Sequence, residues 1–164
     1  LGTLLKRGIP TTEQHRGAAR FGWEMRRVLV CVDEVKRDAV AFALGESEFQ
    51  VHVARNRVQA VERMREERID IVILEASFDQ SEQGAAFVLR EINGLRPTER
   101  RRLFLVQLTD IGRSMDAHIA FINNVSFIVN PEDMSRLAPM LDRGLREYNE
   151  LYRNFNEALQ MSAL

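Results

Sequence analysis

The run of residues from Ile69 to Leu74 constrains the fold more than any other stretch, because it is short, apolar and ends on a carboxylate, Glu75. Near-continuous Ile, Val and Leu over four to eight residues is typical of a strand buried on both faces, as in parallel sheets. In an open α/β sheet, ligands bind beyond the carboxyl ends of the strands. We therefore expect Glu75 at the functional edge of a parallel sheet.

Four other segments have strand composition, and helical patterns separate them. The expected strands are residues 28–32, 49–53, 69–74, 103–108 and 127–129. The expected helices are residues 36–45, a segment capped by Asn56, a segment around 87–95, residues 114–122 and a long helix from about residue 132. Strands that alternate with helices predict a doubly wound α/β domain with a five-stranded parallel sheet. Right-handed crossovers then place helices on both faces of that sheet.

The same topology gathers polar residues at one edge of the sheet. The strand ends bring together Asp33, Glu34, Glu75, Thr109 and Asn130. This convergence follows from the order of the elements and involves no motif match.

Composition limits the classes of function. The chain has 164 residues and a formal net charge of −1, which gives no support to binding of nucleic acid or of a membrane surface. No apolar run approaches the roughly 18 residues that a membrane span needs. The single cysteine excludes an intrachain disulfide, and no signal-peptide pattern is visible, so we expect a cytoplasmic protein.

Other chemistries lack a pattern in the sequence. Cys31 lies within an expected buried strand and is interpreted as a core residue. His15, His52 and His118 do not have the spacing of metal ligands. The chain has no P-loop, no G-x-S-x-G elbow and no G-x-G-x-x-G fingerprint. We therefore expect no catalytic residue and no metal ligand.

The strand-end residues are similar to those of CheY-like receiver domains of bacterial two-component signalling, and the resemblance covers residues 26–147. In that family, two acids after the first strand hold Mg²⁺, and an Asp after the third strand is phosphorylated. A Thr or Ser follows the fourth strand, an aromatic residue lies on the fifth, and Lys-Pro follows it. The resemblance implies a flavodoxin/CheY-like sheet with strand order 2-1-3-4-5.

This sequence retains some residues of the family pattern and replaces others. The resemblance places Val32 and Asp33 at the acid pair (Asp33 and Glu34 with a shift of one residue), Glu75 at the phosphorylated position, Thr109 at the hydroxyl, Phe127 at the aromatic and Asn130 at the lysine. Asn130 cannot supply a cation, and Val32 removes an oxygen ligand for Mg²⁺. Asp79 also replaces the usual proline after the acceptor.

These losses imply a pseudo-receiver that acts through protein–protein contacts and needs no cofactor. We also expect the longer carboxylate of Glu75 to reach toward Thr109 and hold a fixed, partly activated state. Two alternatives stay open. One is an atypical receiver that binds Mg²⁺ and is phosphorylated, and the other is a flavodoxin-like binder of a small ligand at the same edge.

The last helix carries a second prediction. Met134, Leu137, Leu141, Tyr148, Leu151, Phe155 and Ala158 follow a heptad pattern, which Gly144 interrupts. We expect an elongated helix whose last part exposes an apolar stripe and forms a homodimer. The stripe consists of Tyr148, Leu151, Tyr152, Phe155 and Leu159. The predicted organisation is an N-terminal helical arm or linker (1–25), a receiver-like domain (26–147) and a C-terminal helical extension (148–164).

Overall fold

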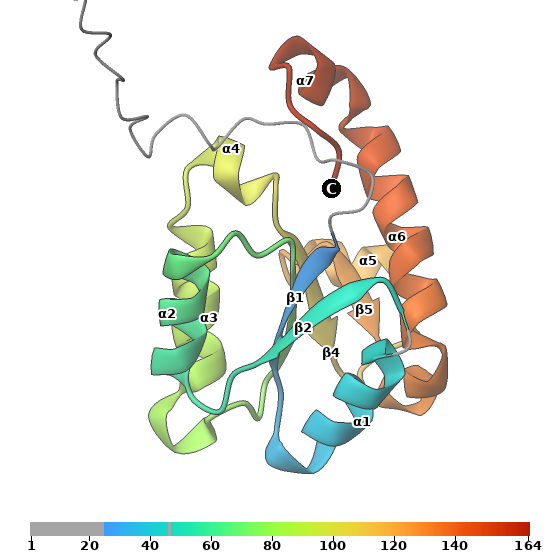
Figure 1. The fold of residues 1–164 in the computed structure, drawn as a ribbon. Coiled ribbons are helices and arrows are strands. Elements are labelled where there is room, and N and C mark those ends of the chain that lie inside the picture. Colours follow the sequence, from blue (N-terminus) through green and yellow to red (C-terminus); the bar gives the residue numbers. More distant parts are fainter. Residues whose placement is uncertain (1–24, 46) are drawn as a thin grey trace, which may run out of the picture.

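The computed structural model describes residues 25–45 and 47–164 of the chain, so the predicted arm at residues 1–25 lies almost wholly outside the described residues. Five parallel strands form one sheet in the order β2-β1-β3-β4-β5 (Figure 1), which confirms the predicted fold class and strand order. The strands are β1 (Arg26–Cys31), β2 (Phe49–Val53), β3 (Ile71–Glu75), β4 (Phe104–Leu108) and β5 (Phe127–Val129).

Helices connect the strands and cover both faces of the sheet. They are α1 (Glu34–Gly45), α2 (Arg57–Glu66), α3 (Gly84–Asn93), α4 (Pro97–Arg100), α5 (Ala117–Ile122), α6 (Leu137–Leu151) and α7 (Arg153–Ala158), with 3₁₀ turns η2 (Gln80–Glu82) and η3 (Pro131–Arg136). Helix α1 packs with α6 on one face, and α2 packs with α3 on the other. None of the helices within the described residues has the length and apolar character needed to cross a bilayer.

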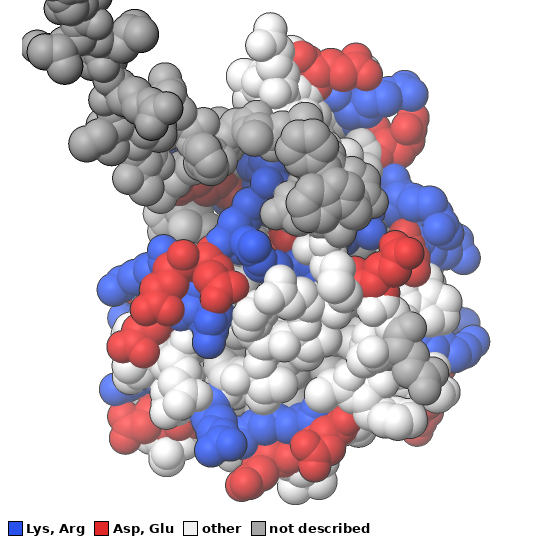
Figure 2. All heavy atoms as spheres, in the orientation of Figure 1, with Lys and Arg blue, Asp and Glu red and all other residues white. Residues whose placement is uncertain are grey.

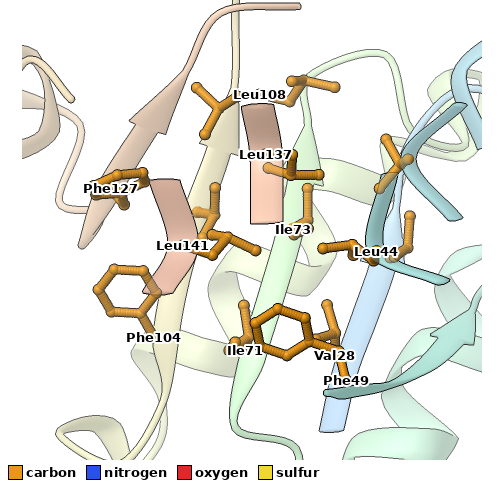
Figure 3. Packing of buried hydrophobic residues seen from close by; sticks show 14 of the residues in the cluster. Val28, Leu44, Phe49, Ile71, Ile73, Phe104, Leu108, Phe127, Leu137 and Leu141 are labelled. Atoms are coloured by element: carbon orange, nitrogen blue, oxygen red, sulfur yellow. The ribbon is translucent and has the colours of Figure 1, made fainter. Parts of the chain in front are cut away.

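Alternation of side chains along the central strands divides the core into two layers. In β1, Val28 and Val30 face α1 and α6, whereas Leu29 and Cys31 face α2 and α3. Leu137 and Leu141 of α6 lie over the first layer, close to Phe127 and Ile73 (Figure 3). The three inner strands are therefore apolar over most of their length, at residues 28–31 of β1, at residues 71–74 of β3 and throughout β4 except at Gln107, as the sequence predicts for a parallel sheet.

Local capping residues set several helix boundaries. The Asn56 side chain accepts a hydrogen bond from the Gln59 N–H at 2.9 Å, which confirms its predicted role as the cap of α2. Helix α5 starts later than predicted because the Asp116 carboxylate caps it, bonding the His118 and Ile119 N–H groups at 3.0 Å each. After α5, Asn124 has a φ of 53°, the left-handed conformation expected of an asparagine there.

The predicted elongated C-terminal helix is not continuous. It begins with the 3₁₀ turn η3, runs as α6, and stops at Tyr152, whose φ of −98° and ψ of 9° leave helical geometry. After α7, Gln160 has a φ of 53°, and the Met161 N–H donates to the Asn156 carbonyl oxygen at 2.8 Å. This bonding pattern reverses the chain, and the final residues return to the domain (Figure 1).

Candidate functional site

The parallel strands bring the predicted site residues to one edge of the sheet. Glu75 is the last residue of β3, Val32 and Asp33 follow β1, Thr109 follows β4, and Asn130 follows β5. Because all five strands run in the same direction, these positions share the carboxyl edge. The predicted convergence of these residues is therefore present in the fold. The interactions of each side chain determine which chemistry the carboxyl edge of the sheet can support.

Glu75 is buried, and both of its carboxylate oxygens have partners within the chain. The residue is 7% exposed. Its Oε1 forms an ion pair with the Lys36 ammonium, and its Oε2 accepts a hydrogen bond from the Asp33 backbone N–H at 3.0 Å. The Lys36 side chain is 38% exposed, so the ammonium reaches the carboxylate from the solvent side. A cation from α1 thus neutralises the carboxylate at the phosphorylated position of the receiver pattern.

The expected contact between Glu75 and Thr109 is not formed. The Thr109 hydroxyl oxygen instead accepts a hydrogen bond from the Ile111 N–H at 3.2 Å, within its own loop. Lys36 and Asp33 lie on the β1–α1 side of Glu75 and contact one carboxylate oxygen each. The carboxylate is therefore joined to α1 and not to the loop after β4.

The two acids after β1 start a helix. The Asp33 carbonyl oxygen accepts hydrogen bonds from the Lys36 and Arg37 N–H groups at 3.0 and 3.2 Å, and its carboxylate makes a long contact of 3.4 Å with the Val35 N–H. Glu34 is exposed and is the first residue of α1. Acidic side chains at these positions stabilise the N-terminus of a helix. Both acids therefore have a structural role in the fold.

The residues at this edge do not fit Mg²⁺. The Val32 side chain is fully buried in the core layer beneath α1, so it offers no oxygen. Glu75 is already paired with Lys36. Within residues 25–45 and 47–164, no group of three or more His, Cys, Asp or Glu side chains is placed to hold a metal ion. Mg²⁺ requires near-octahedral oxygen coordination, and this edge does not present it.

Asn130, at the lysine position of the receiver pattern, joins two loops. Its Oδ1 accepts a hydrogen bond from the Glu132 N–H at 3.0 Å, and its Nδ2 donates to the Gly112 carbonyl oxygen at 3.0 Å. Its backbone N–H donates to the Ser114 hydroxyl oxygen at 2.8 Å. The side chain therefore caps η3 and holds the β4–α5 loop, and both of its polar groups face these loops.

Phe127, at the position of the switch aromatic, is enclosed in the core. It is 6% exposed, and its ring centroid lies 5.6 Å from that of Phe104. Helix α6 crosses it closely at Gly144, where an added Cβ would lie 2.7 Å from the Phe127 ring. Movement of this ring to the surface would require α6 to shift.

The loop after β3 is tied to α2. Asp79, which replaces the proline of the receiver pattern, has a φ of 46°, and its carboxylate accepts a hydrogen bond from the Arg57 N–H at 2.9 Å. The Arg57 guanidinium in turn pairs with Glu82 at 3.0 Å. Gly84 lets the loop close, because a Cβ there would lie 2.4 Å from the Asp79 Cβ.

The predicted exposed stripe at the C-terminus is largely covered by the chain's own domain, which corrects that prediction. The Tyr148 ring packs edge-on to Phe104 with centroids 5.2 Å apart, and its hydroxyl donates to the Arg101 carbonyl oxygen at 3.0 Å. The Tyr152 ring lies tilted against Tyr148 with centroids 4.7 Å apart, and Arg101 lies 4.5 Å over the centre of the Phe155 ring. Only two stripe residues are strongly exposed, namely Leu151 (75%) and Leu159 (46%).

One partner of the site was not predicted. Lys36 occupies the first turn of α1, where a lysine is ordinarily a solvated residue. Its spacing from Asp33 places it one helical turn from the cap, which directs it back over the end of β3. That spacing was the available signal, and it becomes informative only when α1 is known to start at Glu34.

Comparison with solved structures identifies the fold. A response regulator from Thermotoga maritima is 19% identical, with 74% of this chain and 98% of that chain covered and a TM-score of 0.55. The chemotaxis response regulator CheY4 of Vibrio cholerae is 17% identical, with 74% and 100% covered and a TM-score of 0.56. The signal receiver domain of an HD domain-containing protein from Pseudomonas fluorescens Pf-5 is 19% identical, with 83% and 97% covered and a TM-score of 0.59.

These likenesses concern the fold, since the sequences are distant. No protein-family model matches the chain, and no curated protein matches its sequence. The chain has the fold of CheY-like response-regulator receiver domains.

Proposed function

We propose that this chain is a pseudo-receiver, a signalling module that acts through protein–protein contacts without phosphotransfer. The observation that carries the proposal is the pairing of the two Glu75 carboxylate oxygens with the Lys36 ammonium and the Asp33 N–H. Phosphoryl transfer depends on a free attacking oxygen and on cations placed around the phosphoryl group. In this chain the Lys36 ammonium is paired with the Glu75 carboxylate itself. The module then has no catalytic residue, binds no Mg²⁺ and works in the cytoplasm.

Helix α1 is the contact surface that we propose for protein partners. Val35 (87% exposed) and Phe42 (78% exposed) lie at i and i+7, with Ala39 between them on the same stripe. Uncharged side chains cover much of the face over β2 and α1 in Figure 2. Exposed large apolar residues in a patch mark interaction sites, and the Lys36–Glu75 pair fixes the helix that carries them.

A phosphorylation assay tests the proposal. The protein is incubated with acetyl phosphate and Mg²⁺ and its intact mass is measured, beside a receiver domain of known activity and the Glu75→Gln variant. We expect an unchanged mass. A stoichiometric, base-labile gain of one phosphoryl group that Glu75→Gln abolishes would instead make the chain a working receiver.

A binding assay tests the contact surface separately. We expect Val35→Ser/Phe42→Ser to lose partners that the original chain captures from the source cell. Val58→Ser is the matched control, because Val58 is 55% exposed but lies on α2. Equal loss in both variants would remove α1 from the proposal.

A further inference from the structure

The last residues of the chain occupy a defined seat on the domain. We call residues 153–164 the C-terminal segment, and its seat consists of Arg26, Arg101, Arg102 and Asn149. Arg101 covers the Phe155 ring, and the Arg102 guanidinium donates to the Ser162 hydroxyl oxygen at 3.2 Å. Leu164 is 6% exposed and joins the core layer beneath α6. The segment is therefore held at Phe155, Ser162 and Leu164.

The seat recognises the main chain as well as side chains. The Asn149 Nδ2 donates to the Leu164 carbonyl oxygen at 2.7 Å, and the Leu164 N–H donates to the Asn149 Oδ1 at 2.8 Å. The Arg26 guanidinium donates to the same carbonyl oxygen at 3.2 Å. None of these contacts depends on the segment being joined to the domain that holds it. A second copy of the chain can supply the same groups.

The break at Tyr152 sets the direction of the C-terminal segment, within which the turn at Gln160 brings the last residues back to the domain. Tyr152 has a ψ of 9°, whereas helical residues have a ψ near −42°. Rotation to helical geometry would join α6 and α7 into one helix over residues 137–158, about 33 Å long at 1.5 Å per residue. The C-terminal segment would then lie away from its own seat. Short hinges of this kind favour exchange of an element between identical chains.

An exposed leucine lies beside the hinge. Leu151 is 75% exposed, although it precedes Tyr152 and continues the heptad pattern of the helix. In a two-fold exchanged pair, the hinges of both copies meet at the symmetry axis, since each segment crosses there to reach the other seat. The two Leu151 side chains would cover one another at that axis. Exchange would therefore cover an apolar side chain that is exposed among residues 25–45 and 47–164.

We propose that residues 153–164 exchange between two copies of this chain, each copy seating its C-terminal segment on the other. The inference rests on the proposed role in protein–protein contact and not on the loss of phosphotransfer. A failure of exchange would leave the phosphorylation result unchanged, so the two are tested independently.

Crosslinking distinguishes exchange from folding back. The variant Arg102→Cys/Ser162→Cys is treated with a short bismaleimide and compared by denaturing electrophoresis with Ser162→Cys alone. Cys31 will not compete, because it is fully buried and burial raises the pKa of its thiol. We expect a covalent dimer in the double variant only. A crosslink confined to single chains would overturn the proposal, whether light scattering finds a monomer or a dimer.

A matched pair of variants tests the hinge contact. We expect Leu151→Ser to raise the dimer dissociation constant about tenfold or more, because each dimer loses two apolar contacts at the axis. Leu159→Ser is the control, since Leu159 lies at the end of α7 and keeps the same surroundings in either arrangement. Light scattering behind a sizing column across the micromolar range gives both constants. A monomer throughout that range, or equal effects of both variants, would refute exchange.

Discussion

The Lys36 ammonium on α1 and the Glu75 carboxylate at the end of β3 form an ion pair across the carboxyl edge of the sheet. The Asp33 N–H completes the coordination of the same carboxylate. The pair joins α1, the helix that we propose as the contact surface, to the position where receivers take a phosphoryl group. In this chain a lysine ammonium is paired with the carboxylate at the position that is phosphorylated in receivers.

A double-mutant cycle measures that pair. We expect Lys36→Met to lower the free energy of unfolding by about 1–2 kcal/mol, because it leaves a buried carboxylate without its cation. The value is modest because the Lys36 side chain is 38% exposed. Lys36→Met/Glu75→Gln should cost less than the sum of the single changes, as urea unfolding will show.

Lys36→Arg is the control for this cycle, since it keeps a cation on α1. Additive single changes in the cycle would mean that the two side chains do not interact in solution, and the proposed fixation of α1 would fail with them.

Substitutions at Asn130 test its role as a cap. We expect Asn130→Ala to lower the free energy of unfolding by about 1–2 kcal/mol, because the Glu132 N–H and the Gly112 carbonyl oxygen both lose a partner. Asn130→Asp keeps the acceptor and should lose less.

Asn130→Lys restores the receiver residue at this position. We expect its free energy of unfolding to fall as in the alanine variant. We also expect calorimetry to detect no Mg²⁺ binding. Mg²⁺ binding by this single variant would mean that the edge retains a latent receiver site.

The fold was predictable from the sequence because the buried apolar runs and the hydrophobic periodicity of the helices indicate the order of the elements. Apolar runs such as residues 69–74 and 103–108 appear at the centre of the sheet, and Glu75 lies at the predicted edge. The Lys36 partner was not predictable in the same way. A lysine in the first turn of a helix is normally solvated, and only the packing of α1 on the sheet brings this one to Glu75.

The C-terminal break was missed for a related reason. The heptad pattern continues across Tyr152, so periodicity alone favours one long helix. The contacts that stabilise the break involve Arg101 and Phe104, which are distant in sequence. Local patterns do not contain tertiary contacts of this kind, and these contacts outweigh the helical period.

Gly144, read from the sequence as an interruption of the heptads, is required by close packing. A Cβ there would lie 2.7 and 2.9 Å from two carbons of the Phe127 ring and 3.1 Å from the Phe104 ring. We expect Gly144→Ala to lower the free energy of unfolding by about 1–3 kcal/mol, because α6 must move off the sheet.

Gly94→Ala is the matched control for Gly144, since its nearest contact is an ordinary 3.4 Å and its φ of −79° suits any residue. It should change stability by less than about 1 kcal/mol. Urea unfolding of both variants gives the comparison, and equal losses would contradict the packing argument.

The raised pKa of Tyr148 makes the protein less stable at alkaline pH. Burial, followed by the neighbouring Tyr152, raises the pKa of Tyr148 from 10.0 to about 12. The folded chain therefore holds the phenolic proton more tightly than the unfolded chain. Its contribution to stability is complete below pH 10 and is lost as the pH rises toward 12.

We expect the free energy of unfolding to fall more steeply across that window in the original chain than in Tyr148→Phe, which keeps the ring against Phe104 but has no proton to lose. Absorbance of tyrosinate at alkaline pH gives the titration directly. The late transition should disappear in Tyr148→Phe and persist in Tyr152→Phe. A Tyr148 transition at the ordinary pKa of tyrosine would show that the ring is solvated and not packed against Phe104.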